Sequence, residues 1–266
     1  MKAAGRAVTA VVVAVTCAAA GVVVAAQFPA RSADTTEPAV AVTVEVVETH
    51  TAAPAAPAAP AVSPEAIDLD EHSIDDPDSV WVVVNKSRPL DPLDHVPSGL
   101  VSARLPGDSA QLKRAAARAL QRMFDAADAA DAPFRVSSAY RSYGFQQGVY
   151  GNYVSTRGRA SADTFSARPG YSEHQTGLAV DLYDPAGCRL KRCFAETTSG
   201  EWVTKHAADY GFIVRYPEDE SDITGYTWEP WHLRYVGVDL AQYMRDQKIA
   251  TLEEVFGLPA APTYTD

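Results

Sequence analysis

Apolar residues recur with a helical period at four places between residues 108 and 247. The most regular stripe predicts a helix that ends near Ala130, with apolar positions at Leu112, Ala116, Leu120, Met123 and Ala127. Asp108 and Gln111 form a predicted capping box before this helix. Similar stripes predict three further helices, over residues 145–153, 202–210 and 239–247. The first of these is marked by Phe145, Val149 and Tyr153.

Short apolar runs predict strands between and beside these helices. The runs cover residues 80–84, 134–138, 178–183, 213–216 and 231–236. Helices and strands are intermixed without the regular alternation of βαβ units. This order predicts an α+β fold, with a small antiparallel sheet flanked by helices.

The first 28 residues form an expected targeting segment. Lys2 and Arg6 precede an uncharged apolar run over residues 7–26. Such a run is typical of a secretory signal peptide, and at about 20 residues it is also long enough for a membrane anchor. Positive charge before the run places the amino terminus inside, so the rest of the chain is exported in either case.

A linker and a single folded domain are expected after this segment. Residues 29–78 are rich in Pro and Ala and then acidic, a composition that cannot build a core. The domain is expected over residues 79–258, followed by a tail at 259–266. The acidic stretch is interpreted as a solvated spacer.

Charge and cysteine content narrow the function classes. The 23 Lys and Arg are outnumbered by 34 Asp and Glu, which gives a net charge of −11. Nucleic-acid binding is therefore not expected, because it requires a basic surface. Cys188 and Cys193 are close enough to pair. A disulfide is favoured in an exported chain, and the alternative is metal binding, although no second cysteine pair completes such a site.

Two separated segments carry residues suited to catalysis by zinc. His174 and Asp181 are followed downstream by Glu229 and His232. Catalytic zinc takes three protein ligands and leaves a position for water, on which the remaining carboxylate can act as a base. Pro230 excludes a helical HExxH arrangement, because it restricts Glu229 to extended geometry. Spacing alone leaves open that either histidine is structural.

At these residues the sequence resembles a known family. Residues 172–181, Ser-Glu-His-Gln-Thr-Gly-Leu-Ala-Val-Asp, resemble the SxHxxGxAxD motif of VanY-type zinc D-alanyl-D-alanine carboxypeptidases. Residues 229–232, Glu-Pro-Trp-His, resemble that family's ExxWH motif. Residues 138–143 with Gln146 are similar to its substrate-binding segment, and residues 84–90 to its domain start. No ligand or catalytic position departs from the pattern.

The resemblance implies a role for each matching residue. His174, Asp181 and His232 would bind zinc, and Glu229 would be the catalytic base. Arg141 would bind the terminal carboxylate of the peptide, unless it forms a structural salt bridge. Hydrogen bonds around the cleaved bond would come from Ser138, Gln146 and Ser172. Glu173 is not expected to be a ligand.

The resemblance also implies a reaction and a location. The expected function is removal of the C-terminal D-alanine from peptidoglycan stem peptides. Export, which the N-terminal segment predicts, agrees with this substrate, and the chain is expected to be a monomer that contacts the membrane only through that segment. The alternatives are an L,D-carboxypeptidase acting on tetrapeptide stems, and a related dipeptidase or endopeptidase. A wall-binding protein without turnover is a third possibility, and the intact Glu229 argues against it.

Overall fold

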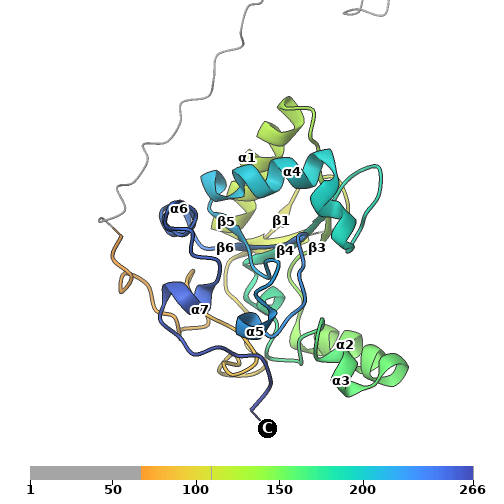
Figure 1. Ribbon diagram of the computed structural model, residues 1–266, viewed down its shortest axis with the longest axis vertical. Helices are drawn as coiled ribbons and strands as arrows, with labels where there is room; N and C mark the ends of the chain where they lie inside the picture. Colours follow the sequence, from red (N-terminus) through yellow and green to blue (C-terminus); the bar gives the residue numbers. More distant parts are fainter. Residues whose placement is uncertain (1–66, 109, 266) are drawn as a thin grey trace, which may run out of the picture. The chain divides into compact units, whose positions relative to one another are not determined.

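The structure is a computed structural model that describes residues 67–108 and 110–265 (Figure 1). The expected targeting segment and most of the expected linker lie outside the described residues. Within them, no helix is both long enough and apolar enough to cross a membrane. The strands are β1 Leu100–Ala103, β2 Ala110–Lys113, β3 Arg135–Ser138, β4 Ala179–Tyr183, β5 Phe212–Val214 and β6 His232–Tyr235. The α-helices are α1 Arg114–Ala129, α2 Tyr143–Arg157, α3 Arg159–Ala162, α4 Thr198–His206, α5 Ser221–Thr224, α6 Val238–Gln247 and α7 Leu252–Val255, and 3₁₀ turns are η1 Glu173–Thr176, η2 Arg192–Glu196 and η3 Ala207–Tyr210.

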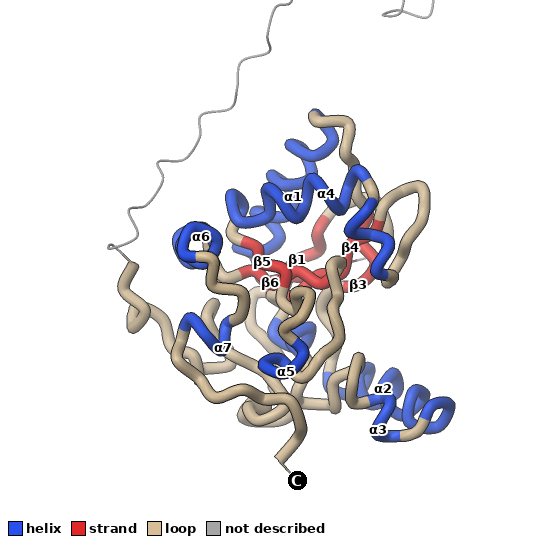
Figure 2. The backbone as a smooth tube through the Cα atoms, viewed as in Figure 1, coloured by secondary structure: helices blue, strands red, loops and turns tan. Residues whose placement is uncertain are grey.

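The strands form two antiparallel sheets, which confirms the predicted α+β class. The larger sheet has four strands in the order β3-β4-β6-β5, and the smaller pairs β1 with β2. Figure 2 shows the strands between α1 and α4 on one side and α5 on the other.

Alternation along the strands separates a core face of the large sheet from a polar face. On β4, Val180 and Leu182 are buried in the main apolar cluster, together with Leu233 of β6. Residues of α1 and α4 complete this cluster. Successive strand residues point to opposite faces, so Asp181 and His232 project from the other side of the sheet.

The predicted start of the first long helix is wrong. Gln111 and Leu112 belong to β2, which pairs with β1, and α1 begins at Arg114 without a side-chain cap. Asp108 instead forms an ion pair with Arg189. Leu112 fitted the helical stripe because it enters the same apolar cluster as the buried residues of α1.

The run at residues 80–84 is buried but is not a strand. Its backbone groups bond to loops and side chains: the Val83 N–H donates to the Ile74 carbonyl at 3.0 Å, and Arg234 donates to the carbonyls of Val80 and Val82. Burial alone therefore produced the apolar pattern, and no neighbouring strand pairs with it.

Packing extends beyond the expected domain limits at both ends. Ile67, Leu69 and Ile74 pack against a second apolar cluster that includes Trp81 and Leu240. At the other end, the Tyr264 hydroxyl accepts a hydrogen bond from the backbone of Arg168 at 2.9 Å.

Helix α2 is present as predicted, but its apolar stripe is not part of the core. Ser142 caps it by accepting a hydrogen bond from the Phe145 N–H. The only buried residue of α2 is Gln146, and Phe145 is 60% exposed. The apolar stripe of α2 therefore has a role other than packing in the core.

Candidate metal centre and active site

Three neighbouring strands place polar side chains in one row. Ser138 of β3 lies opposite Asp181 of β4, and Asp181 lies opposite His232 of β6. Asp181 and His232 are buried at 5% and 4% exposure. The distance from Asp181 Oδ1 to His232 Nδ1 is 3.1 Å.

His174 reaches this row from η1. Gly177 ends this turn with φ of 70°, a left-handed conformation that favours glycine, and the chain then enters β4. The His174 Nδ1 lies 2.6 Å from the Ala139 carbonyl, which can only accept, so Nδ1 carries the proton. The unprotonated Nε2 faces Asp181 Oδ2 at 3.3 Å.

These three residues can hold a metal ion. One ligand atom from each of His174, Asp181 and His232 lies within 4.8 Å of the others. His174 Nε2 and Asp181 Oδ1 are buried without a hydrogen-bond partner among the described residues. Buried polar atoms normally form hydrogen bonds, so atoms that converge without one fit a cation. Two imidazoles and one carboxylate are a donor set that zinc prefers.

The protonation states of the two histidines differ. Burial, with Arg141 nearby, lowers the pKa of His174 to about 4, so this imidazole is neutral and ready to bind a metal. Burial also opposes the charged form of His232, but its contacts with Asp181 and Glu173 outweigh this and raise its pKa to about 9. A metal ion bound at this histidine would displace the proton.

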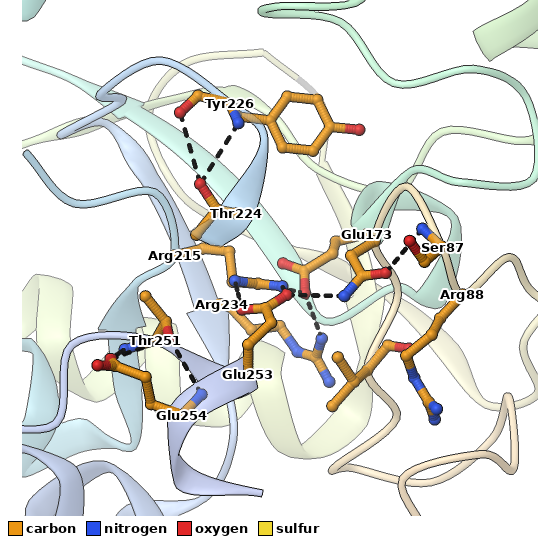
Figure 3. A network of polar contacts seen from close by, with 12 residues as sticks. Ser87, Arg88, Glu173, Arg215, Thr224, Tyr226, Arg234, Thr251, Glu253 and Glu254 are labelled. Carbon is orange, nitrogen blue, oxygen red and sulfur yellow. Dashed lines mark hydrogen bonds and ion pairs between the residues drawn. The ribbon is translucent and has the colours of Figure 1, made fainter. Parts of the chain in front are cut away.

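Glu173 lies behind the His232 ring. Its Oε1 accepts hydrogen bonds from Arg215 at 2.9 Å and from Arg234 at 2.8 Å. Its Oε2 faces His232 Nε2 at 3.6 Å, on the side of the ring away from Asp181. Figure 3 shows both arginines directed at this carboxylate, with Glu253 beyond Arg215. Burial opposes ionisation, but the two arginines hold the pKa of Glu173 well below its usual range.

Replacing this carboxylate should weaken metal binding. Partners that orient a ligating histidine typically contribute about 10–100-fold in metal affinity, so we expect Glu173→Gln to raise the zinc Kd by roughly that factor. The measurement is competition with a chromophoric chelator. Glu253→Gln is the matched control, because it disturbs the same Arg215 without facing His232. It should lower Tm and leave the zinc Kd unchanged. Equal zinc affinity in Glu173→Gln and wild type would contradict this role.

Glu229 lies beside the three candidate ligands without joining them. It stands in an irregular segment before β6, as Pro230 predicted, and its N–H donates to the Tyr216 carbonyl at 2.9 Å. Its Oε2 is 3.9 Å from His232 Nδ1. Burial raises the pKa of Glu229 to about 8. A metal cation nearby would lower that pKa and poise the group for proton transfer near neutral pH.

Arg141 is brought to the same site by two contacts. Its backbone N–H donates to the His174 carbonyl at 3.2 Å, and its Nη1 donates to Gln146 Oε1 at 2.9 Å. Gln146 is anchored in turn on the Ala167 carbonyl at 2.7 Å. The Arg141 Nε is buried and has no acceptor among the described residues. A guanidinium held in this way can bind a carboxylate.

The three residues expected to supply hydrogen bonds around the cleaved bond lie at different points of the site. The Ser138 hydroxyl donates to Asp181 Oδ2 at 2.6 Å and therefore holds a candidate metal ligand. Gln146 is 1% exposed and orients Arg141. Ser172 lines the cleft, and its carbonyl accepts a hydrogen bond from the Gln175 N–H at the start of η1.

A cleft of about 500 Å³ opens over these groups. Its inner lining includes Arg141, Ser172, His174, Asp181, Glu229 and His232. An open space beside a metal site, a buried carboxylate and an arginine can accept the end of a peptide chain.

The predicted disulfide is confirmed. Cys188 is bonded to Cys193, with the two Cα atoms 5.6 Å apart. We expect thiol labelling of the native protein to modify neither cysteine before reduction and both after it. Labelling of both without reductant would contradict the bond. Cys188→Ser is the reference, because its Cys193 should be labelled at once.

Comparisons with known proteins agree with this geometry. The family described as "VanY: D-alanyl-D-alanine carboxypeptidase" matches residues 109–238. A protein of Bacillus subtilis (strain 168) named "Putative carboxypeptidase YodJ" is 41% identical over 191 residues, which are 69% of this chain and 69% of that protein. This chain belongs to the VanY family.

Solved structures of similar peptidases share the fold. The LdcB LD-carboxypeptidase has a TM-score of 0.64 and 40% identity, and the match covers 68% of this chain and 87% of that chain. A VanY D,D-pentapeptidase from a VanB-type resistance cassette, solved with Zn(II), has a TM-score of 0.55 and 32% identity over 66% of this chain and 97% of that chain. Carboxypeptidases that differ in stereochemical preference therefore both resemble this chain.

Proposed function

We propose that this chain is an exported, zinc-dependent carboxypeptidase that removes the C-terminal D-alanine from peptidoglycan stem peptides. One observation carries the proposal: the buried ligand atoms of His174, Asp181 and His232 converge in a cleft that also contains Glu229 and Arg141. Its relatives support the substrate class, since LdcB is described in terms of peptidoglycan recognition and a VanY relative in complex with D-alanine-D-alanine.

His174 Nε2, His232 Nδ1 and a carboxylate oxygen of Asp181 would hold the zinc ion. Bound there, zinc supplies a Lewis acid for the scissile carbonyl and a water of lowered pKa. Ser138 and Glu173 keep two of the ligands in place, through contacts with Asp181 and His232.

Arg141 binds the substrate in this mechanism, and Glu229 transfers the protons. The planar guanidinium of Arg141, oriented by Gln146, binds the terminal carboxylate of the peptide. This contact places the last peptide bond over the site. Glu229 takes a proton from the attacking water while the new C–O bond forms, and it returns a proton to the amide nitrogen as the C–N bond breaks. The products are free alanine and a stem peptide shortened by one residue.

A second candidate is an L,D-carboxypeptidase acting on tetrapeptide stems. LdcB, an LD-carboxypeptidase, has both a higher identity and a higher TM-score than the D,D-pentapeptidase VanY. The two activities share the metal site and the terminal carboxylate. They differ in the configuration of the residue before the cleaved bond.

Stem peptides of different length distinguish the two candidates. The purified protein is incubated separately with pentapeptide and tetrapeptide stems, and the products are identified by mass. The D,D proposal predicts loss of one alanine from the pentapeptide and none from the tetrapeptide. The reverse result would support the L,D candidate. Intact peptides in both reactions would overturn both activities and support a wall-binding role.

A further inference from the structure

Helix α2 forms an outer wall of the active-site cleft. Phe145, Val149, Tyr153 and Arg157 follow one another at intervals of four residues, and all four line the cleft. Residues at this spacing share one face of a helix. An apolar face normally packs onto a core, but this one borders the cleft. Figure 1 shows α2 and α3 set apart from α1, α4 and α6.

The disulfide loop borders the cleft as well. Leu190 lies between Cys188 and Cys193, lines the cleft and is 45% exposed. Four large apolar side chains among the described residues are classed as exposed, and two of them, Phe145 and Leu190, line this cleft. Exposed apolar residues that gather at one site indicate a binding surface.

Arg157 ends the α2 stripe and is held by aromatic rings. Its guanidinium lies 5.1 Å from the ring centre of Phe165 and 5.8 Å from that of Tyr153, and the two rings meet edge to face at 4.9 Å. Aromatic faces attract a cation without using its hydrogen-bond donors. Within residues 67–108 and 110–265, no carboxylate forms an ion pair with Arg157.

The other two arginines of the cleft have polar partners. Arg141 donates to Gln146, and Arg189 pairs with Asp108 and donates to Ser137 Oγ at 2.9 Å. Among the described arginines of the cleft, only Arg189 has a carboxylate partner, so the charge of Arg157, like that of Arg141, is left for a ligand. The place of Arg157 at the far end of α2 separates it from the metal centre.

We infer that the α2 wall binds the substrate on the amino side of the cleaved bond, with Arg157 pairing with a substrate carboxylate there. This inference rests on the proposed function, because Arg141 must hold the chain end. Phe145 and Arg157 are 12 residues apart, which is about 18 Å of helix. An extended peptide covers that distance in roughly five residues. The carboxylate should therefore lie at roughly the fourth to sixth residue, counted from the C-terminus.

A peptide series tests this spacing. Each peptide ends in D-Ala-D-Ala and carries one Glu, placed from the third to the eighth residue from the C-terminus, with Gln at the same place in its control. The inference predicts that the Glu-to-Gln ratio of kcat/KM peaks at the fourth to sixth residue. A partly exposed charge pair should give a peak of roughly three- to tenfold, weaker at high salt. If the enzyme prefers an L residue before the last D-Ala, the same series is made in that form.

Two arginine variants make the test specific. Arg157→Gln should flatten the peak to a ratio near one, whereas the matched control Arg159→Gln, an exposed arginine of α3 outside the cleft, should keep it. In a second series of peptides that differ in length, Phe145→Ser should reduce the ratio of kcat/KM for long peptides to that for short ones. Gln147→Ala, exposed on α2 outside the cleft, should leave this ratio unchanged.

The outcomes separate this inference from the proposed function. Cleavage of the peptides with a flat Glu-to-Gln ratio in wild type would overturn the Arg157 site alone. A peak that persists in Arg157→Gln would overturn it as well. Failure to cleave any peptide of the series would overturn the proposed function and the inference with it.

Discussion

Glu229→Gln should keep its zinc and lose turnover by about 10²–10⁴-fold or more. An amide cannot accept the proton of the attacking water, and in the proposed mechanism the same group also protonates the leaving amine. Glu229 is not among the convergent ligand atoms, so metal content should be unaffected. Burial raises its pKa to about 8 without a metal, and a cation bound nearby would lower that pKa toward neutral pH.

The measurement pairs metal content with single-turnover rates. His174→Ala is the matched control, because it removes a proposed ligand and should lose both zinc and activity. A Glu229→Gln protein with zinc and a near-wild-type rate would assign proton transfer to another group. Loss of zinc from Glu229→Gln would instead make Glu229 a ligand.

The second large effect concerns Arg141. Amidation of the substrate's C-terminus should lower kcat/KM by roughly ten- to a hundredfold, because a charge-assisted hydrogen bond contributes about 1.5–3 kcal/mol. Arg141→Lys should be nearly as poor as Arg141→Ala on free-acid peptides, since an ammonium cannot form two parallel bonds to a carboxylate. Both variants should lose most of the preference for acid over amide.

The decisive quantity is the acid-to-amide ratio of kcat/KM in wild type and in Arg141→Ala. Gln146→Ala is an informative companion, because it removes the group that orients Arg141 and should reduce the ratio less than Arg141→Ala. A wild-type ratio near one, or an unchanged ratio in Arg141→Ala, would contradict this role and favour an endopeptidase.

The sequence predicted elements whose pattern reflects burial on one face. β4 and α1 were recognised because Val180, Leu182, Leu120 and Met123 contact one core. The apolar pattern was misleading where buried residues belong to a loop instead of a helix or strand. Val82 and Val84 are buried in a loop held by long-range hydrogen bonds, which local periodicity does not report.

The residues of the candidate site that belong to the two sequence motifs were predictable. His174, Asp181, Glu229 and His232 lie together as expected, because the two motifs enter adjacent strands. The role of Glu173 was missed, since its partners Arg215 and Arg234 are 42 and 61 positions away along the chain. A charged residue next to a candidate ligand was the only local signal. The apolar stripe of α2 predicted the helix but not what the stripe faces, because periodicity does not distinguish a core from a cleft.

The central claim is that this chain is a zinc-dependent carboxypeptidase, and the dependence of cleavage on metal tests it most directly. The purified protein is incubated with a pentapeptide stem before chelation, after chelation and after zinc is restored, and the products are identified by mass. The account predicts loss of one C-terminal alanine, abolished by the chelator and restored by zinc. Cleavage at an internal bond, or release of alanine that chelation leaves unchanged, would contradict it.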